Sequence, residues 1–195
     1  MRKIVVAVLA LFITAGTACY AQVSLGVKAG VNITNFSGGD FDAVKKKANV
    51  GFHGGGYINI PVANIFSIQP ELMVSTQGAK IDSVNGSYDW KLTYITVPVM
   101  ARFGSKNGFY FEAGPQFGFK ISEDIGGQTI DDFANDLDLG AALGLGFQSK
   151  GGLGIGARYI AGLSKVGDFE SSSIDPDFKN SVIQVSLYLS LSGNK

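Results

Sequence analysis

From Val23 to the end of the chain, apolar residues alternate with polar or small residues in eight separate stretches. A period of two that lasts through a whole segment is typical of β-strands with one apolar face. The stretches cover residues 23–34, 50–60, 66–77, 91–103, 109–121, 137–147, 153–163 and 183–191. The pattern therefore predicts an all-β protein with eight strands.

Charged residues inside these stretches gather on the face opposite the apolar one: Lys28, Glu71, Arg102, Glu112, Lys120, Asp138 and Arg158. A soluble sheet has no need to clear one face of charge, whereas an Arg or Lys aimed into lipid costs about 2–4 kcal/mol at mid-depth. We therefore predict an eight-stranded antiparallel up-and-down transmembrane β-barrel with a polar, side-chain-filled interior. A soluble exported barrel with an apolar interior is the alternative, because alternation alone does not say which face is outside.

The connections between the predicted strands alternate in length. Those after the second, fourth and sixth strands are short, whereas residues 37–49, 78–90, 122–135 and 165–180 form longer, polar connections. Barrels of bacterial outer membranes combine short periplasmic turns with long extracellular loops. Four phenylalanines on the apolar parity lie beside the short turns, and we expect them to form an aromatic ring at that rim: Phe66, Phe103, Phe109 and Phe147.

The first 21 residues have the features of a secretory leader. Arg2 and Lys3 precede an apolar run over residues 4–13, and Ala21 offers a cleavage site. We expect residues 1–21 to be a cleaved signal peptide and residues 22–195 to be a barrel domain in the outer membrane of a Gram-negative cell. The alternatives are a membrane-anchoring helix, for which the apolar run is short, and lipidation of Cys19.

The charge balance and the cysteine count exclude two kinds of chemistry. Loss of Arg2 and Lys3 with the leader lowers the basic count from 16 to 14 against 16 acidic residues. This balance gives no electrostatic case for binding nucleic acid. Cys19 is the only cysteine, so its removal leaves no thiol and no disulfide.

Charges enclosed in a barrel of eight strands must pair, because its interior is only wide enough for side chains to fill it. The inward set is close to balance, with four basic and three acidic residues. We expect Arg102, Arg158 and Lys28 to bridge Glu71, Glu112 and Asp138, with further hydrogen bonds from Tyr57, Tyr94 and Gln116. Small inward glycines leave room for these side chains. A filled and balanced interior predicts a plug without sizeable ion conductance.

No catalytic, cofactor-binding or metal-ligating residue is assigned from the sequence. His53 is the single histidine and lies on the inward parity, where we expect it to be hydrogen-bonded in the interior. Glu71 and Glu112 are interpreted as members of ion pairs instead of the paired carboxylates of a hydrolase. An acidic stretch is interpreted as solvated loop carboxylates instead of a weak calcium site: Asp131, Asp132, Asp136 and Asp138.

Several short segments follow one another in a characteristic order: VKAGVN at 27–32, QPEL at 69–72, YITVPV at 94–99 and FEAGP at 111–115. With the Gly/Leu-rich stretch after them, they resemble the PorT-like, or porin-family, outer-membrane β-barrel proteins. The resemblance implies an eight-stranded outer-membrane barrel and carries over no functional residue. Pro70 and Pro98 fall within predicted strands, where each removes a ladder donor and predicts a bulge.

The function that we expect is non-enzymatic: an integral outer-membrane barrel with a structural role or a role in surface contacts through its extracellular loops. The alternative is an accessory barrel of a secretion or envelope-assembly machine that binds partner proteins. A lipid-modifying barrel enzyme is less favoured, because such enzymes need a Ser–His pair near the outer rim and the sequence shows none. Expected partners are outer-membrane lipid, lipopolysaccharide and envelope or secretion proteins, around a monomeric barrel that uses no cofactor.

Overall fold

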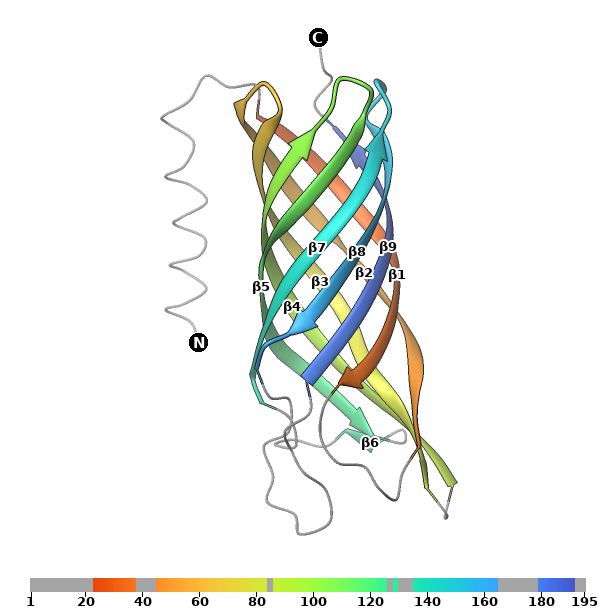
Figure 1. Ribbon diagram of the computed structural model, residues 1–195. Helices are drawn as coiled ribbons and strands as arrows, with labels where there is room; N and C mark the ends of the chain where they lie inside the picture. The colour runs from red at the N-terminus through yellow and green to blue at the C-terminus, as the bar shows by residue number, and fades with distance from the viewer. Residues whose placement is uncertain are drawn as a thin grey trace.

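The computed structural model is a β-barrel, and it describes residues 23–37, 45–83, 86–125, 128–129, 135–164 and 179–191 (Figure 1). The strands are β1 (Ser24–Ser37), β2 (Lys45–Ala63), β3 (Phe66–Ser83), β4 (Gly86–Gly104), β5 (Phe109–Ile125), β6 (Gln128–Thr129), β7 (Leu137–Gln148), β8 (Leu153–Gly162) and β9 (Lys179–Ser190). Within these ranges there is no helix that has the length and hydropathy to cross a membrane.

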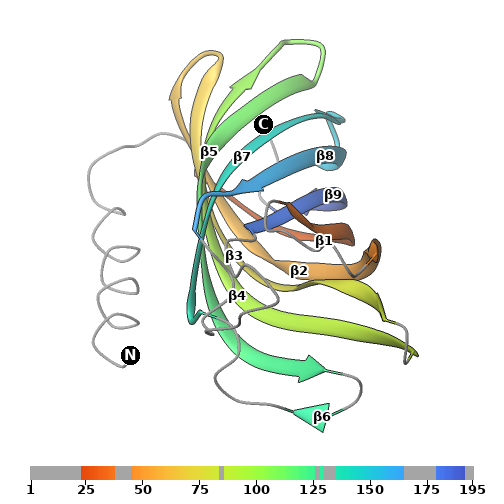
Figure 2. The same ribbon diagram turned by 60° about the horizontal axis from the view of Figure 1, so that its bottom comes forward.

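Eight of the strands form the wall, and every neighbouring pair in it is antiparallel (Figure 2). Their order is β4-β3-β2-β1-β9-β8-β7-β5, and pairing of β4 with β5 closes the cylinder. The first and last strands lie side by side, with Val27 opposite Leu189. The two-residue strand β6 pairs with the end of β5. The predicted eight-stranded antiparallel up-and-down barrel is therefore confirmed, and its closure removes the exposed edges of an open sheet.

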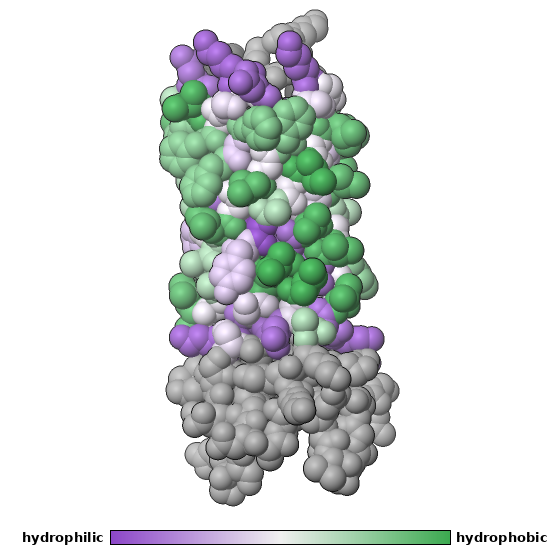
Figure 3. Space-filling model, turned by 45° about the vertical axis from the view of Figure 1, so that its right-hand side comes forward, coloured by the Kyte–Doolittle hydropathy of each residue, from purple (hydrophilic) through white to green (hydrophobic). Residues whose placement is uncertain are grey.

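The outer surface of the wall carries a belt of large apolar side chains (Figure 3). Leu145 on β7 and Leu187 on β9, for example, are 65% and 61% exposed. Along each of these strands, exposed residues alternate with buried residues that point inward. Figure 3 shows the belt between two polar zones. An apolar surface of this extent is typical of contact with lipid. The alternative of a soluble barrel with an apolar interior is wrong, because most of the buried side chains in the described interior are polar or charged, and the large apolar side chains face outward.

Six strands are longer at the end with the long connections than the alternation pattern predicts: β1, β2, β3, β4, β5 and β9. β3 continues to Ser83 and β4 begins at Gly86, within residues 78–90 that we expected to be a loop, and Ser83 pairs with Gly86. β2 begins at Lys45 and β5 ends at Ile125. Backbone hydrogen bonds can extend a hairpin without any alternation of apolar side chains, so the sequence pattern does not reveal these extensions. Since about 9–11 residues cross a bilayer, strands of 17–19 residues project beyond the lipid.

The prolines in β3 and β4 interrupt the ladder without the predicted bulge. Pro70 lies opposite Val99, and after a gap beside Pro98 the pairing resumes with Met73 opposite Thr96 in the same register. Each proline lacks a backbone N–H, so it removes a hydrogen bond but inserts no extra residue. The expected bulges at these two positions are therefore wrong.

The phenylalanines expected at the short-turn rim contact one another in two pairs. The ring centroids of Phe66 and Phe103 are 5.0 Å apart across β3 and β4. Those of Phe109 and Phe147 are 5.2 Å apart across β5 and β7. The aromatic group at this rim is confirmed, in the form of two cross-strand pairs.

Candidate functional site: the barrel interior and its short-turn mouth

A cluster of four charged side chains fills the middle of the barrel. The guanidinium of Arg158 donates to both carboxylates, with Nη2 at 2.8 Å from Glu71 Oε1 and 2.6 Å from Glu112 Oε1. Lys28 Nζ lies 2.6 Å from Glu71 Oε1. All four residues are buried, and together they carry two positive and two negative charges. The predicted ion pairs of Lys28 and Arg158 are confirmed, and the shared arginine favours the structural interpretation of the two carboxylates.

Arg102 does not bind a carboxylate among the described residues, so the predicted ion pair of this arginine is wrong. Its guanidinium instead donates to three neutral oxygens: Gln69 Oε1 at 3.0 Å, Gln148 Oε1 at 2.8 Å and the hydroxyl of Tyr188 at 3.1 Å. It also stacks on Tyr110, with 3.6 Å between the guanidinium carbon and the ring centroid. Parity predicts that Arg102 points inward, but it does not predict toward which end of the barrel. In the structure, the side chain faces the short-turn mouth.

Asp138 also lacks the arginine or lysine partner that we expected among the described residues. Its oxygens accept hydrogen bonds from Asn180 Nδ2 at 2.9 Å and Ser164 Oγ at 3.2 Å. These partners lie at the end of the barrel with the long connections. Because Asp138 and the arginines lie at different depths, their shared parity does not bring them together.

The alternation pattern does not reveal the buried carboxylate of Glu123, because we expected residues 122–135 to form a loop. The β4–β5 pairing shifts between Thr93 and Tyr94, which leaves Ile121 as an extra residue on β5. A bulge of this kind changes the parity of the residues that follow. Glu123 therefore faces the interior, where its Oε2 lies 3.2 Å from Lys120 Nζ.

His53 is buried at the centre of a hydrogen-bonded chain from three strands. Its Nδ1 lies 2.7 Å from Asn32 Oδ1, and its Nε2 lies 2.8 Å from Ser186 Oγ. The expectation of a hydrogen-bonded interior histidine is confirmed. A Ser–His pair, which the sequence did not reveal, is thus formed by β2 and β9, but it lies inside the barrel. All three side chains are buried, whereas a nucleophile must reach its substrate.

Three tyrosines separate the central cluster from the short-turn end of the barrel. The rings of Tyr57 and Tyr188 meet edge to face with 6.0 Å between centroids, and those of Tyr110 and Tyr188 with 6.1 Å. Gly26 and Gly154 make room for them, because a Cβ at either position would overlap a tyrosine ring. The expectation that inward glycines accommodate large side chains is confirmed at these two positions.

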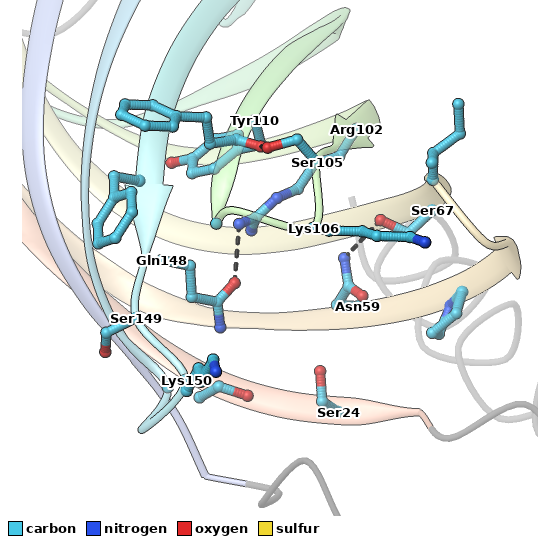
Figure 4. Close-up of a pocket in the computed structure, with 18 of the residues that line it drawn as sticks. Ser24, Asn59, Ser67, Arg102, Ser105, Lys106, Tyr110, Gln148, Ser149 and Lys150 are labelled. Atoms are coloured by element: carbon cyan, nitrogen blue, oxygen red, sulfur yellow. Dashed lines mark hydrogen bonds between the residues drawn. The ribbon is translucent and has the colours of Figure 1, made fainter.

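Beyond the tyrosines the barrel opens into a vestibule of about 1290 Å³ (Figure 4). Arg102, Tyr110 and Gln148 lie at its inner end, and Figure 4 shows the hydrogen bond from Arg102 to Gln148. The short turns supply Lys106 and Lys150 at its rim. The alternation pattern does not reveal this mouth. The feature of the sequence that points to the mouth is a lysine in each of two consecutive short turns. Parity describes only residues within strands, so it does not cover these lysines.

Among the described residues, no group of three His, Cys, Asp or Glu side chains lies close enough to hold a metal ion. Of the acidic stretch considered for calcium, Asp131 and Asp132 lie outside the described residues. The Asp136 side chain is 84% exposed and its Oδ1 lies 3.8 Å from Lys120 Nζ. Asp138 faces the interior, so the two described members of the stretch do not share one site.

A family model described as the outer membrane protein beta-barrel domain matches residues 20–168, which is more than half of the chain. The chain belongs to this outer-membrane barrel family. No curated protein matches the chain at a significant level. The matched description places the barrel in an outer membrane, and the exposed apolar belt on its wall fits contact with lipid.

Solved structures of other outer-membrane proteins share the fold of this barrel. Neisserial surface protein A is 16% identical, with a TM-score of 0.53 and coverage of 86% of this chain and 97% of that protein. Ail, the attachment invasion locus protein of Yersinia pestis, is 16% identical, with a TM-score of 0.48 and coverage of 87% and 99%. OprG from Pseudomonas aeruginosa is 13% identical, with a TM-score of 0.47 and coverage of 87% and 99%. At 16% identity the likeness to Neisserial surface protein A shows the fold alone.

Membership in this family gives the barrel an orientation. Outer-membrane barrels place their short turns in the periplasm and their long connections outside the cell. The vestibule is therefore the periplasmic mouth of the barrel. The extensions of β3 and β4 lie at the cell surface, at the bottom of Figure 1.

Proposed function

We propose that this outer-membrane barrel is a non-enzymatic, closed protein that strengthens the membrane and makes contacts at the cell surface. The observation that carries this proposal is the charge-neutral cluster of Lys28, Glu71, Glu112 and Arg158 in the lumen. Arg158 bridges the two carboxylates, so an ion that crossed the barrel would have to break buried ion pairs. Tyr94 and Met100, which are fully buried in the same interior, occupy further space.

The cell-surface end of the barrel provides the area for contacts. The strands β2 to β5 continue beyond the length that crosses lipid, and β3 and β4 form one hairpin up to Ser83 and Gly86. A paired hairpin offers a rigid surface, which lowers the entropic cost of binding a partner. Lipopolysaccharide and envelope proteins are the partners that we propose, around a monomeric barrel. We also propose that residues 1–21 are a cleaved signal peptide, which lies outside the described residues.

Conductance measurements test the closed state. Purified full-length barrel should show no large, stable single-channel openings in planar bilayers. As a matched comparison, Arg158→Ala removes the side chain that bridges Glu71 and Glu112, and should raise the frequency of small openings. Large and stable openings from the unmodified protein would contradict the proposal. Heat-modifiable migration on gels and recovery with the outer membrane check that the sample is a folded barrel.

A second candidate is an accessory barrel of a secretion or envelope-assembly machine. It is favoured by the order of the QPEL, YITVPV and FEAGP segments, which resembles the PorT-like proteins. Co-purification in mild detergent separates the two candidates. A stoichiometric envelope partner supports the accessory role, whereas a barrel recovered alone supports the structural one.

The lipid-modifying alternative is tested at His53. The variant His53→Ala removes both imidazole nitrogens from the Ser186 and Asn32 chain. Lipid mass spectrometry of cells that carry this variant should match cells that carry the unmodified protein. A lipid species that is lost in both the deletion strain and the His53 variant would overturn the non-enzymatic assignment.

A further inference from the structure

The two arginines inside the barrel are neutralised unequally. Arg158 lies between the carboxylates of Glu71 and Glu112. Arg102, only 7% exposed, has hydrogen-bond partners that are all neutral: Gln69, Gln148 and Tyr188. A buried cation that has lost its hydration is unfavourable unless an anion lies close to it. Arg102 therefore makes no ion pair with a carboxylate among the described residues, although Glu112 lies opposite it across β4 and β5.

The neighbouring cluster does not supply that counter-charge. Gln69 connects Arg102 to Glu71, because its amide nitrogen donates to Glu71 Oε1 at 2.8 Å while its oxygen accepts from Arg102. The charge of Glu71 is, however, already shared by Lys28 and Arg158. Glu112, which lies opposite Arg102 in the β4–β5 pairing, is paired with Arg158 instead. The cluster as a whole is neutral, so the charge of Arg102 remains in surplus at the periplasmic end.

Two further cations surround the same hollow. Figure 4 shows Lys106, Lys150 and Arg102 around the vestibule, and no Asp or Glu is found among its described lining residues. A cleft lined by charges of one sign between walls of low dielectric constant concentrates the opposite ion.

We propose that the periplasmic mouth binds a polyvalent phosphate group, with Arg102 at the base of the site and Lys106 and Lys150 at its rim. A guanidinium offers five N–H donors in one plane, and three of its hydrogen bonds here go to neutral partners. Stacking on Tyr110 holds that plane in place. A formal charge of three favours a polyvalent oxyanion over a single carboxylate. The phosphate belongs either to a soluble periplasmic compound or to the headgroup of an anionic phospholipid in the inner leaflet.

Calorimetric titration of the full-length barrel with inorganic pyrophosphate in a non-ionic detergent tests the site. The variant Arg102→Gln keeps a polar side chain but removes the charge, and should weaken binding by about tenfold or more. The double variant Lys106→Gln/Lys150→Gln should weaken binding several-fold and reduce its dependence on salt. The matched control is Lys91→Gln, which removes an exposed lysine at the opposite end of β4 and should leave binding unchanged.

A second measurement separates the two sources of the phosphate. In native mass spectrometry from mixed micelles, retention of phosphatidylglycerol by the unmodified protein but not by Arg102→Gln assigns the site to a lipid headgroup. Binding of pyrophosphate without lipid retention assigns it to a soluble compound.

Two results would overturn the proposal. One is that the unmodified barrel binds neither pyrophosphate nor phosphatidylglycerol at about 0.15 M salt. The other is that the charge-removing variants bind as tightly as the unmodified barrel. If Arg102→Gln loses its heat-modifiable migration and is therefore unfolded, the lysine pair decides the question, because both lysines are exposed on turns.

Discussion

Replacement of Arg158 by Met should destabilise the barrel more than any other single change in the central cluster. The variant removes four hydrogen bonds from the guanidinium to Glu71 and Glu112 and changes the charge of the cluster from zero to minus one. Removal of one partner from a buried ion pair costs about 3–5 kcal/mol, because the remaining charge is left without compensation. We therefore expect the free energy of unfolding to fall by about this amount.

A second substitution tests whether charge or packing causes that loss. In Arg158→Met/Glu112→Gln the cluster is neutral again, since Lys28 and Glu71 remain as a pair with 2.6 Å between Nζ and Oε1. The loss in free energy of unfolding in the double variant should be smaller than the sum of the losses in the two single variants, by a coupling energy of about 2 kcal/mol. Loss of the volume of Arg158 alone would give no such recovery.

Equilibrium unfolding in urea, with the folded fraction read from gel mobility, measures both quantities. Lys106→Met on an exposed turn serves as the control and should change the stability by less than about 0.5 kcal/mol. An uncompensated buried charge is not the cause if Arg158→Met costs less than about 1 kcal/mol, or if the double variant is no more stable than Arg158→Met.

Two further predictions concern the wall of the barrel and can be measured in the same unfolding assay. Leu143→Arg, in the middle of β7, should cost about 2–4 kcal/mol, whereas Leu153→Arg, at the periplasmic start of β8, should cost about 0–1 kcal/mol; equal costs would contradict a lipid belt. Gly154→Ala should cost about 1–3 kcal/mol because the new Cβ overlaps the ring of Tyr188. Gly54→Ala, whose Cβ would meet atoms no closer than 3.9 Å, should be tolerated, and a similar loss there would exclude the steric explanation.

Parity along the strands predicted which side chains share a face, except beyond the bulge in β5. Leu145 and Leu187 are exposed and Glu71 and Arg158 are buried, as the alternation indicates. Side-chain direction in a strand depends on local backbone geometry, and a sequence contains that information. The number of strands in the wall and the positions of the short turns follow from the same pattern.

The partners of the inward side chains depended on the tertiary structure. Arg102 and Asp138 share a parity with the central cluster, but the tilt and register of the strands place them at opposite ends of the lumen. Glu123 enters the interior only because a bulge at Ile121 changes the parity of β5. Pairing between strands sets the depth of each residue, and depth is a property of the closed barrel that no single strand contains.

The sequence alone thus divided the strand residues into an apolar and a polar face, because alternation is a local property of extended backbone. Only the tertiary structure decided which charges meet, because register and strand tilt set the distances between residues that are far apart in the chain. The neutral cluster around Arg158 and the surplus charge of Arg102 at the periplasmic mouth therefore depend on the tertiary structure.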